Sequence, residues 1–303
     1  KDFLKFSNSN VHLLRLNMSH LDLKQLEKNI LYIKRFSKIP ICIDTEGAQI
    51  RTKCHKSKFF KKHEIFKVYY DKKYHFYPNE VFKNLKVNDK LDIGFNGLIV
   101  KIKNKSKSYL SCKVLAQGYF EPNKGVHVVN RKFHLNYLTD KDKEALNIGK
   151  KYKIKNYALS FTNNHKDVIR FNNLLKNENK IFKIETNQAI KNFKKIIKFG
   201  DNFLIDRGDL SKDVSIENVP IIQRQVVKIA NKSKKKVYVA TNFLESMLVN
   251  SYPTRAEVND IYNTIEMGSK GLVLAAETAI GNNPKECVRI LKKIISAFKK
   301  KNG

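Results

Sequence analysis

The chain has 303 residues, of which 42% are hydrophobic and 29% are charged, and its formal net charge is +32. This balance excludes a globally disordered chain, and no apolar run approaches the length that spans a bilayer. The length suits a single α/β barrel or two domains, and the first residues, Lys1 to Lys5, do not resemble a secretion signal.

The positive charge raises the question of a polyanionic partner, because lysines contact phosphates. Two features weaken this interpretation. Lys greatly outnumbers Arg, whereas phosphate and groove recognition often favours Arg. The chain is also rich in Asn, Ile, Phe and Tyr, which share AT-rich codons with Lys, so genome composition explains the charge better. We therefore expect no nucleic-acid partner.

The four cysteines show no metal-binding or redox spacing such as CxxC; they are Cys42, Cys54, Cys112 and Cys287. Cys42 lies in an apolar run and Cys287 in a helical pattern, where buried free thiols are common. We therefore expect reduced thiols and a cytoplasmic location.

The first elements alternate between strand and helix patterns. Val11 to Leu16 is typical of a strand, Leu21 to Phe36 has the spacing of an amphipathic helix, and Ile39 to Ile43 is typical of a second strand. Such alternation favours a parallel sheet with crossover helices.

From about residue 52 to residue 132 the pattern changes. Short alternating runs, separated by Asn, Gly and Lys clusters, are typical of a small β domain; they cover residues 64–70, 90–93, 98–102 and 109–115. We predict three parts: residues 1–52 begin a (β/α)8-type barrel, residues 53–132 form an inserted β-barrel cap, and residues 133–303 complete the barrel.

Strand and helix patterns alternate again after Leu138 to Asp142, where Thr139 and Asp140 are suitable helix-start residues. The later strands end at Ser160, Glu185, Asp209, Thr241 and Glu277. With the two earlier strands this gives seven. A closed barrel of this type needs eight, so we expect the missing strand upstream of Lys1.

Two short segments follow consecutive predicted strands: Lys183-Ile184-Glu185 and Asp206-Arg207-Gly208-Asp209. In a parallel barrel they meet at the carboxyl ends of the strands. Carboxylates such as Glu185 and Asp209 suit a divalent metal ion, and a lysine such as Lys183 suits a developing oxyanion.

At this point the chain resembles the pyruvate kinase family over nearly its whole length. The residues that carry the resemblance are Arg15–His20 (RLNFSH in the family), Asp44–Thr52 (DTKGPEIRT), Leu138–Asp142 (LTEKD), Ser160-Phe161 (ASF), Lys183–Glu185 (KIE), Arg207–Leu210 (RGDL), Ala240-Thr241 (ATQM), Pro253–Val258 (PTRAEV) and Glu277–Ala279 (GETA). The resemblance implies a (β/α)8 barrel with a β cap. It also implies phosphoryl transfer from phosphoenolpyruvate to ADP, with Mg2+ (or Mn2+) and K+ as cofactors. The first barrel strand and the usual C-terminal domain of the family are absent from this sequence.

By the same resemblance, Glu185 and Asp209 hold the divalent metal ion. Lys183 stabilises the transferring phosphoryl group and the enolate, and Arg15 contacts phosphate. The alternative without a catalytic role is a solvated strand-end lysine for Lys183 and a surface carboxylate pair for Glu185 and Asp209. Arg donates from a rigid fork that suits phosphate oxygens.

The remaining implied roles concern the nucleotide, K+ and the reacting carbon. Arg51, Asn17 and Lys124 match nucleotide-binding positions, and a second set matches the K+ site: Asn17, Ser19, Asp44 and Thr45. For Asn17 and Ser19 a strand-end turn is an equal alternative. Amides around Gly208 receive the substrate carboxylate. Thr241 lies near the carbon that is protonated, unless it only caps the strand end.

Several residues depart from the family pattern. Asp206 stands where the family has a small residue, which adds negative charge beside a pocket for an anionic substrate. Phe95 and Asn96 replace acidic residues of the cap, while Glu46 and Gln49 alter the segment near the K+ site. These departures leave open a catalytically weakened or inactive descendant with a scaffold or polyanion-binding role. A lyase of the aldolase type that acts on phosphoenolpyruvate or pyruvate is the third alternative. We also expect a homo-oligomer formed through barrel–barrel contacts.

Overall fold

The computed structural model describes residues 1–94, 97–131 and 133–302. Phe95 and Asn96, two of the departures from the family pattern, lie outside the described residues. The chain divides into two compact units: unit 1 comprises residues 1–47 and 140–303, and unit 2 comprises residues 48–139. Each unit is described by itself below.

Unit 1 is built around seven parallel strands in the order β1-β2-β12-β13-β14-β15-β16. Their bounds are β1 Leu14–Asn17, β2 Ile41–Asp44, β12 Asn156–Leu159, β13 Asn179–Ile184, β14 Asn202–Asp206, β15 Lys236–Ala240 and β16 Gly271–Val273. Within the described residues β1 pairs only with β2 and β16 only with β15, so the sheet is an open barrel. The predicted seven parallel strands of an α/β barrel are confirmed.

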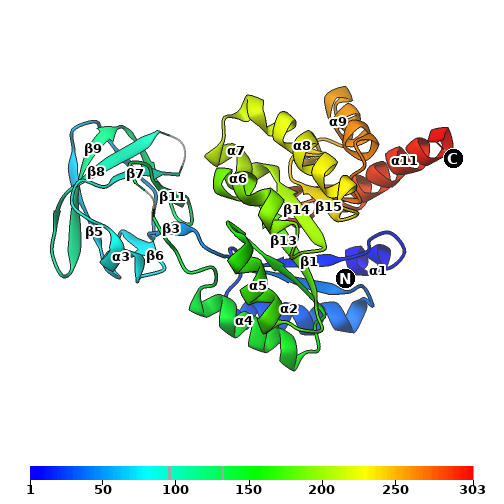
Figure 1. Ribbon diagram of the computed structural model, residues 1–303, viewed down its shortest axis with the longest axis horizontal. Helices are drawn as coiled ribbons and strands as arrows, with labels where there is room; N and C mark the ends of the chain where they lie inside the picture. The colour runs from blue at the N-terminus through cyan, green and yellow to red at the C-terminus, as the bar shows by residue number, and fades with distance from the viewer. Residues whose placement is uncertain (95–96, 132, 303) are drawn as a thin grey trace. The chain divides into compact units, whose positions relative to one another are not determined.

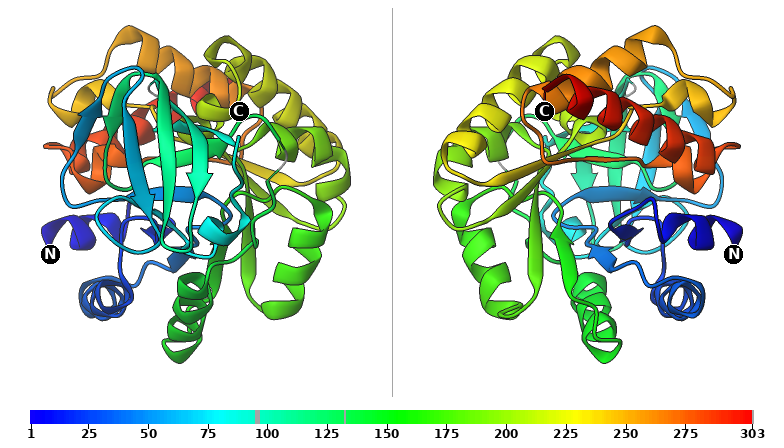
Figure 2. Two further views of the ribbon diagram at one scale, coloured as in Figure 1. Left: turned by 90° about the vertical axis from the view of Figure 1, so that its left-hand side faces the viewer. Right: turned by 90° about the vertical axis from the view of Figure 1, so that its right-hand side faces the viewer.

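Helices follow the strands and lie around the outside of the sheet (Figure 1 and Figure 2). The α-helices are α1 Asp2–Ser7, α2 Leu23–Phe36, α4 Asp140–Lys151, α5 His165–Leu174, α6 Asn187–Ile196, α7 Arg207–Asp213, α8 Val219–Lys232, α9 Arg255–Glu266, α10 Ala276–Ala279 and α11 Pro284–Asn302. Two 3-10 helices complete the unit, η1 Ile216–Asn218 and η2 Glu245–Leu248. Among the described residues no helix is long and apolar enough to cross a membrane.

Local sequence explains where several helices begin. The Asp22 side chain accepts a hydrogen bond from the Gln25 amide at 2.7 Å, and the Gln25 side chain accepts one from the Asp22 amide. Asn164 and Thr254 form the same capping box at the starts of α5 and α9. This arrangement satisfies amides that a helix start leaves unpaired.

The inner strands of unit 1 are buried on both faces, as strands of a parallel sheet with outer helices must be. All four residues of β2 are buried, whereas every residue of the outer strands β1 and β16 is half-buried. The polar exceptions to this apolar interior are therefore informative. Four of them lie at or within one residue of the carboxyl ends of strands: Asp44, Lys183, Glu185 and Asp206.

Unit 2 contains a closed barrel with the strand order β11-β3-β6-β5-β9-β8-β7 and a separate pair, β10-β4. Its elements are β3 Ile50–Lys53, β4 Lys58–Phe60, β5 Ile65–Tyr69, β6 His75–Tyr77, α3 Val81–Asn84, β7 Lys90–Ile93, β8 Leu98–Lys105, β9 Tyr109–Ala116, β10 Gly118–Phe120 and β11 Gly125–Val128. Residues 48–52 group with this unit because β3 pairs with β6 and β11.

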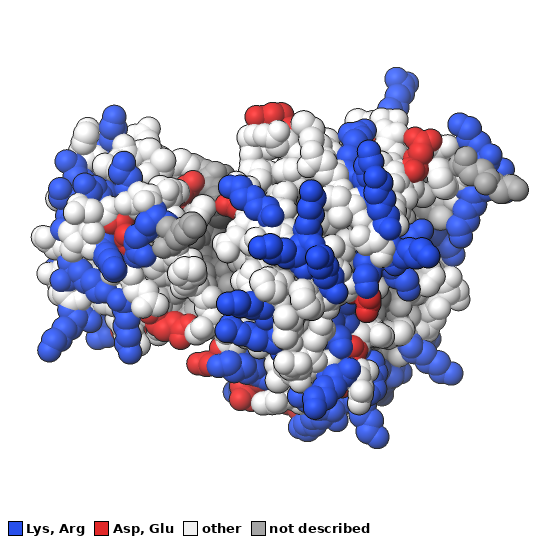
Figure 3. Space-filling model, in the orientation of Figure 1, with Lys and Arg blue, Asp and Glu red and all other residues white. Residues whose placement is uncertain are grey.

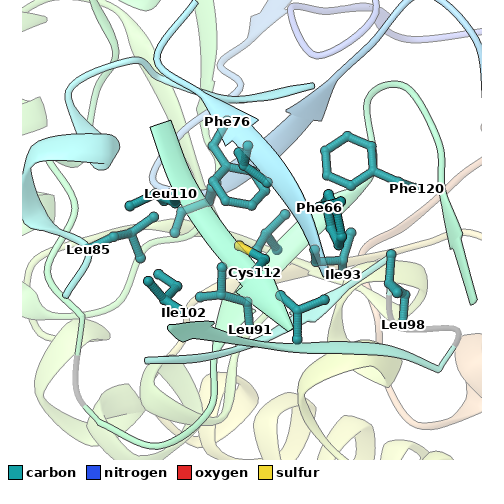
Figure 4. Close-up of a cluster of buried hydrophobic side chains, with 14 of the residues drawn as sticks. Phe66, Phe76, Leu85, Leu91, Ile93, Leu98, Ile102, Leu110, Cys112 and Phe120 are labelled. Atoms are coloured by element: carbon teal, nitrogen blue, oxygen red, sulfur yellow. The ribbon is translucent and has the colours of Figure 1, made fainter. Parts of the chain in front are cut away.

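The barrel of unit 2 encloses a core of aromatic and aliphatic side chains, several of which point toward one another in Figure 4. The Phe60 and Phe66 rings stack with centroids 3.9 Å apart, and Phe66 meets Phe120 edge to face. A fully buried side chain of this size contributes about 1.5–3 kcal/mol. Alternating apolar residues, such as Leu110, Cys112 and Val114 of β9, supply this core.

Candidate active site

The carboxyl ends of the parallel strands bring together side chains that are far apart in the sequence. Arg15 and Asn17 come from β1, Asp44 ends β2, and Lys183 lies near the end of β13. Asn17 pairs in register with Asp44, so the two strands end at the same level. In barrels of this class the carboxyl ends of the strands carry the active site.

Lys183 is at the centre of the cluster, and its side chain is only 4% exposed. Its Nζ lies 2.7 Å from Glu185 Oε1, 3.3 Å from Asp44 Oδ2 and 3.4 Å from Asp206 Oδ2. It also donates a hydrogen bond to Ser160 Oγ at 3.2 Å. Three buried carboxylates therefore surround one buried ammonium group.

Arg15 adds a second cation to the same carboxylates. Its NH1 lies 3.2 Å from Asp44 Oδ2 and 3.8 Å from Asp206 Oδ2. NH1 is buried, yet it has no partner in hydrogen-bonding geometry among the described residues. An unsatisfied guanidinium donor in a buried site suits an anionic ligand.

The electrostatics of the cluster follow from burial and from the mutual contacts. Burial of Lys183 opposes its charged form, but Asp44, Glu185 and Asp206 together raise the pKa of Lys183 above its ordinary value. Burial also raises the pKa of Glu185, and the positive charge of Lys183 only partly opposes this. The charge of Lys183 alone therefore does not fully stabilise the Glu185 carboxylate, which a further cation would stabilise.

A divalent cation would fit next to Glu185. One ligand oxygen from each of Glu185, Asp206 and Asp209 lies within 4.8 Å of the others. Glu185 Oε1 is buried and has no partner in hydrogen-bonding geometry among the described residues, although Lys183 is close by. Hard carboxylate oxygens are the donors that Mg2+ and Mn2+ prefer, so the donor set fits such an ion.

Gly208 and Thr241 meet at the neighbouring strand ends. The Gly208 amide donates a hydrogen bond to Thr241 Oγ1 at 2.8 Å, and Thr241 Oγ1 donates to the Ala240 carbonyl. Thr241 has a φ of 75°, which a β-branched residue rarely adopts. The Arg207 side chain donates a hydrogen bond to the Thr241 carbonyl and forms an ion pair with Asp260 at 2.7 Å. These two contacts hold the strained turn in place.

The residues proposed for K+ lie side by side at the ends of β1 and β2. Asn17 Oδ1 accepts a hydrogen bond from the Ser19 amide, and Thr45 Oγ1 accepts one from the Ser160 amide. Asp44 already contacts both Lys183 and Arg15. The oxygen donors suit a monovalent cation by type, and its binding stays a prediction.

Arg51 and Lys124 belong to unit 2, on neighbouring strands of its barrel. Arg51 of β3 pairs in register with Gly125, which follows Lys124 at the start of β11. The Thr52 amide donates to the Lys124 carbonyl at 2.8 Å, so the two basic residues come from segments in direct contact. They are therefore neighbours in unit 2, and their binding of a nucleotide stays a prediction.

Two residues of the cluster were not assigned a site role from the sequence. Ser160 joins Asp44 to Lys183, because its Oγ donates to Asp44 Oδ1 at 3.1 Å. Asp206 contacts both cations. Each is a polar residue at the end of an apolar run, which is the signal that could have identified them. Gly47 packs against Ser160 so closely that an added Cβ would lie 2.7 Å from the Ser160 carbonyl oxygen.

The parallel strands, the helices around them and the charged residues at the carboxyl strand ends define a protein of the (β/α)8-barrel class, with a small β-barrel unit inserted after its second described strand. A family model described as the barrel domain of pyruvate kinase matches residues 2–288. The chain belongs to the pyruvate kinase family.

Individual relatives agree with this assignment. The chain is 32% identical to the pyruvate kinase of Thermotoga maritima over 98% of its own length and 67% of that protein. It is 32% identical to the pyruvate kinase of Clostridium perfringens over 92% of the chain and 63% of that protein. It is 30% identical to plastidial pyruvate kinase 3 of Arabidopsis thaliana over 95% of the chain. The chain spans 53–67% of the length of these relatives.

Proposed function

We propose that the chain transfers the phosphoryl group of phosphoenolpyruvate to ADP, giving pyruvate and ATP, as the last step of glycolysis. The observation that carries the proposal is the contact of Lys183 with Glu185 at 2.7 Å, beside the carboxylates of Asp206 and Asp209. The proposal extends the family assignment from the barrel to an activity of this chain.

Arg15 and Lys183 would receive the phosphate of the substrate. Both cations contact the same oxygen, Asp44 Oδ2, so they are close enough to bind one phosphate group together. Phosphoryl transfer depends mainly on position and on neutralisation of charge. Lys183 would then stabilise the enolate oxygen that forms as the phosphoryl group leaves.

Glu185 and Asp209 would hold Mg2+ or Mn2+, which when bound would neutralise charge on the substrate oxygens. Gly208 would receive the substrate carboxylate at the start of α7, where its amide now donates to Thr241. Thr241 would lie near the enolate carbon and orient the water that protonates it. Asn17, Ser19, Asp44 and Thr45 would bind K+, and Arg51 and Lys124 of unit 2 would contact the nucleotide.

The test is a coupled assay with phosphoenolpyruvate, ADP, Mg2+ and K+. We expect pyruvate formation by the wild type and a loss of several orders of magnitude in Lys183→Met and Glu185→Gln. Lys236→Met, on the exposed first residue of β15, is the matched control and should keep full activity. A folded wild type without pyruvate formation would contradict the proposal.

A scaffold or polyanion-binding role is the competing function, and the net charge of +32 is its main support. In the view of Figure 3, Lys and Arg side chains are spread over the surface and do not form a single patch. The face drawn there therefore shows no single basic patch that would favour this function. The proposal also includes a cytoplasmic location and a homo-oligomer. Size-exclusion chromatography with light scattering would test the oligomer.

A further inference from the structure

Asp206 lies between the two cations of the candidate site. Its Oδ2 is 3.4 Å from Lys183 Nζ and 3.8 Å from Arg15 NH1. These are the two groups to which the proposed function assigns the phosphate of the substrate. The Asp206 carboxylate therefore occupies the electrostatic position of an anion beside both of them.

The Asp206 carboxylate faces the two cations, and it is also one of the three carboxylates whose oxygens lie within 4.8 Å of one another. The side chain is 7% exposed, and it makes no capping hydrogen bond to α7, although it directly precedes that helix. A buried carboxylate is costly unless it is paired with opposite charge. Ion pairs with Lys183 and Arg15 compensate the buried charge of Asp206. The same negative charge lowers the positive electrostatic potential around these two cations.

We propose that Asp206 is an internal counter-ion, which competes with an incoming phosphate group for Lys183 and Arg15 and so lowers the affinity of the site for anions. The inference rests on the proposed function where it names phosphoenolpyruvate as the anion. Competition with phosphate itself does not depend on turnover. Asp206 is a residue that sets affinity and does not take part in bond making.

The experiment measures binding of inorganic phosphate by isothermal titration, without a divalent ion, to the wild type, Asp206→Asn and Asp206→Ala. Asn keeps the size of the side chain and removes its charge. The control is Asp201→Asn, an 82% exposed carboxylate just before the other end of β14. Circular dichroism and thermal unfolding establish that each variant is folded.

Both Asp206 variants should bind phosphate on the order of tenfold to a hundredfold more tightly than the wild type, because one nearby negative charge has been removed. Asp201→Asn should match the wild type. In the coupled assay, at a Mg2+ concentration that saturates each variant, the Asp206 variants should show a lower KM for phosphoenolpyruvate, whereas a purely structural role would lower kcat or stability instead.

Three results would overturn the inference. The first is an unchanged phosphate affinity, which includes undetectable binding to all four proteins. The second is weaker binding by the Asp206 variants, which would mean that Asp206 holds the cations in place, and the third is tighter binding by Asp206→Ala alone, which would mean that space and not charge limits binding. If the wild type lacks activity but the phosphate result is as expected, the proposed function fails and the counter-ion role stands.

Discussion

The ammonium nitrogen of Lys183 lies 2.7 Å from Glu185 Oε1, and both side chains are closed off from solvent, with 4% and 0% exposure. A buried pair of this kind is stable only while both partners are present. Here the cation also faces Asp44 and Asp206, so three carboxylates depend on it.

Lys183→Met should therefore destabilise the fold as well as abolish activity. The loss of the buried cation leaves neighbouring carboxylates uncompensated, which typically costs about 3–5 kcal/mol. The measurement is urea unfolding of the whole chain. Hydrogen exchange of amides in β13 and β14 reports on the stability of unit 1. Lys236→Met should be within about 0.5 kcal/mol of the wild type. Equal stability of Lys183→Met and wild type would contradict the ion-pair network.

The sequence predicted that Lys183 and Glu185 meet at the strand ends, but not the contacts of Lys183 with Asp44 and Asp206. Each polar residue follows an apolar run, so its place at a strand end could be predicted from the pattern. The contact between Lys183 and Asp44 joins residues 139 positions apart and depends on how β2, β12 and β13 pair. Asp44 was predicted as a K+ ligand, and its ion pairs with both cations were not foreseen.

Unit 2 shows a different limit of prediction. Its longer strands, such as β8 and β9, were predicted because their side chains alternate over several residues. The strands β4, β6 and β10 have three residues each, and so short an element has too few alternations to be recognised. Their positions are set by pairing with distant strands, which local sequence does not encode.

Metal binding can be separated from activity. We expect the wild type to bind Mn2+ at one tight site, measured by electron paramagnetic resonance, and chelation by EDTA to abolish turnover. Glu185→Gln and Asp209→Asn should each weaken Mn2+ binding by about tenfold or more, because each removes a charged oxygen ligand. Asp201→Asn is the control. Wild-type Mn2+ affinity in both variants would place the metal ion elsewhere.

Asp89 in unit 2 should make stability depend on pH. Burial alone would raise the pKa of Asp89, but hydrogen bonds from Arg131 and Lys86 lower it below its ordinary value. Arg131 binds both oxygens of Asp89, at 2.6 and 2.8 Å. Because the folded-state pKa is the lower one, the contribution is present above the unfolded value of about 4 and is lost as pH falls through the folded value.

Arg131→Gln should therefore destabilise unit 2 by about 2 kcal/mol at pH 7. The difference from the wild type should shrink as the pH is lowered below about 4, since protonated Asp89 no longer attracts the guanidinium. Hydrogen exchange of β7 and β8 amides at several pH values measures this. Arg224→Gln, an exposed position, should have no such effect. A difference that stays constant with pH would exclude the Asp89 pair as its source.

Gly208 offers the sharpest separation of function from folding. It lies in helix α7, and an added Cβ would meet Asp206 Oδ1 and Thr241 Oγ1 at 3.5 Å, which is ordinary van der Waals contact. The fold therefore has room for alanine. Since Gly in a helix costs about 0.5–1 kcal/mol relative to Ala, Gly208→Ala should be as stable as the wild type or more stable.

Activity should move in the opposite direction. If the Gly208 amide receives the substrate carboxylate, a methyl group beside it displaces the substrate, and a misplacement of about 1 Å costs about a hundredfold in kcat/KM. Gly149→Ala is the contrasting variant, because its Cβ would lie 2.5 Å from the Tyr157 hydroxyl and should destabilise the fold instead. Thermal unfolding and the coupled assay, measured on both variants, decide the point. A Gly208→Ala protein with full activity would show that substrate does not approach this amide.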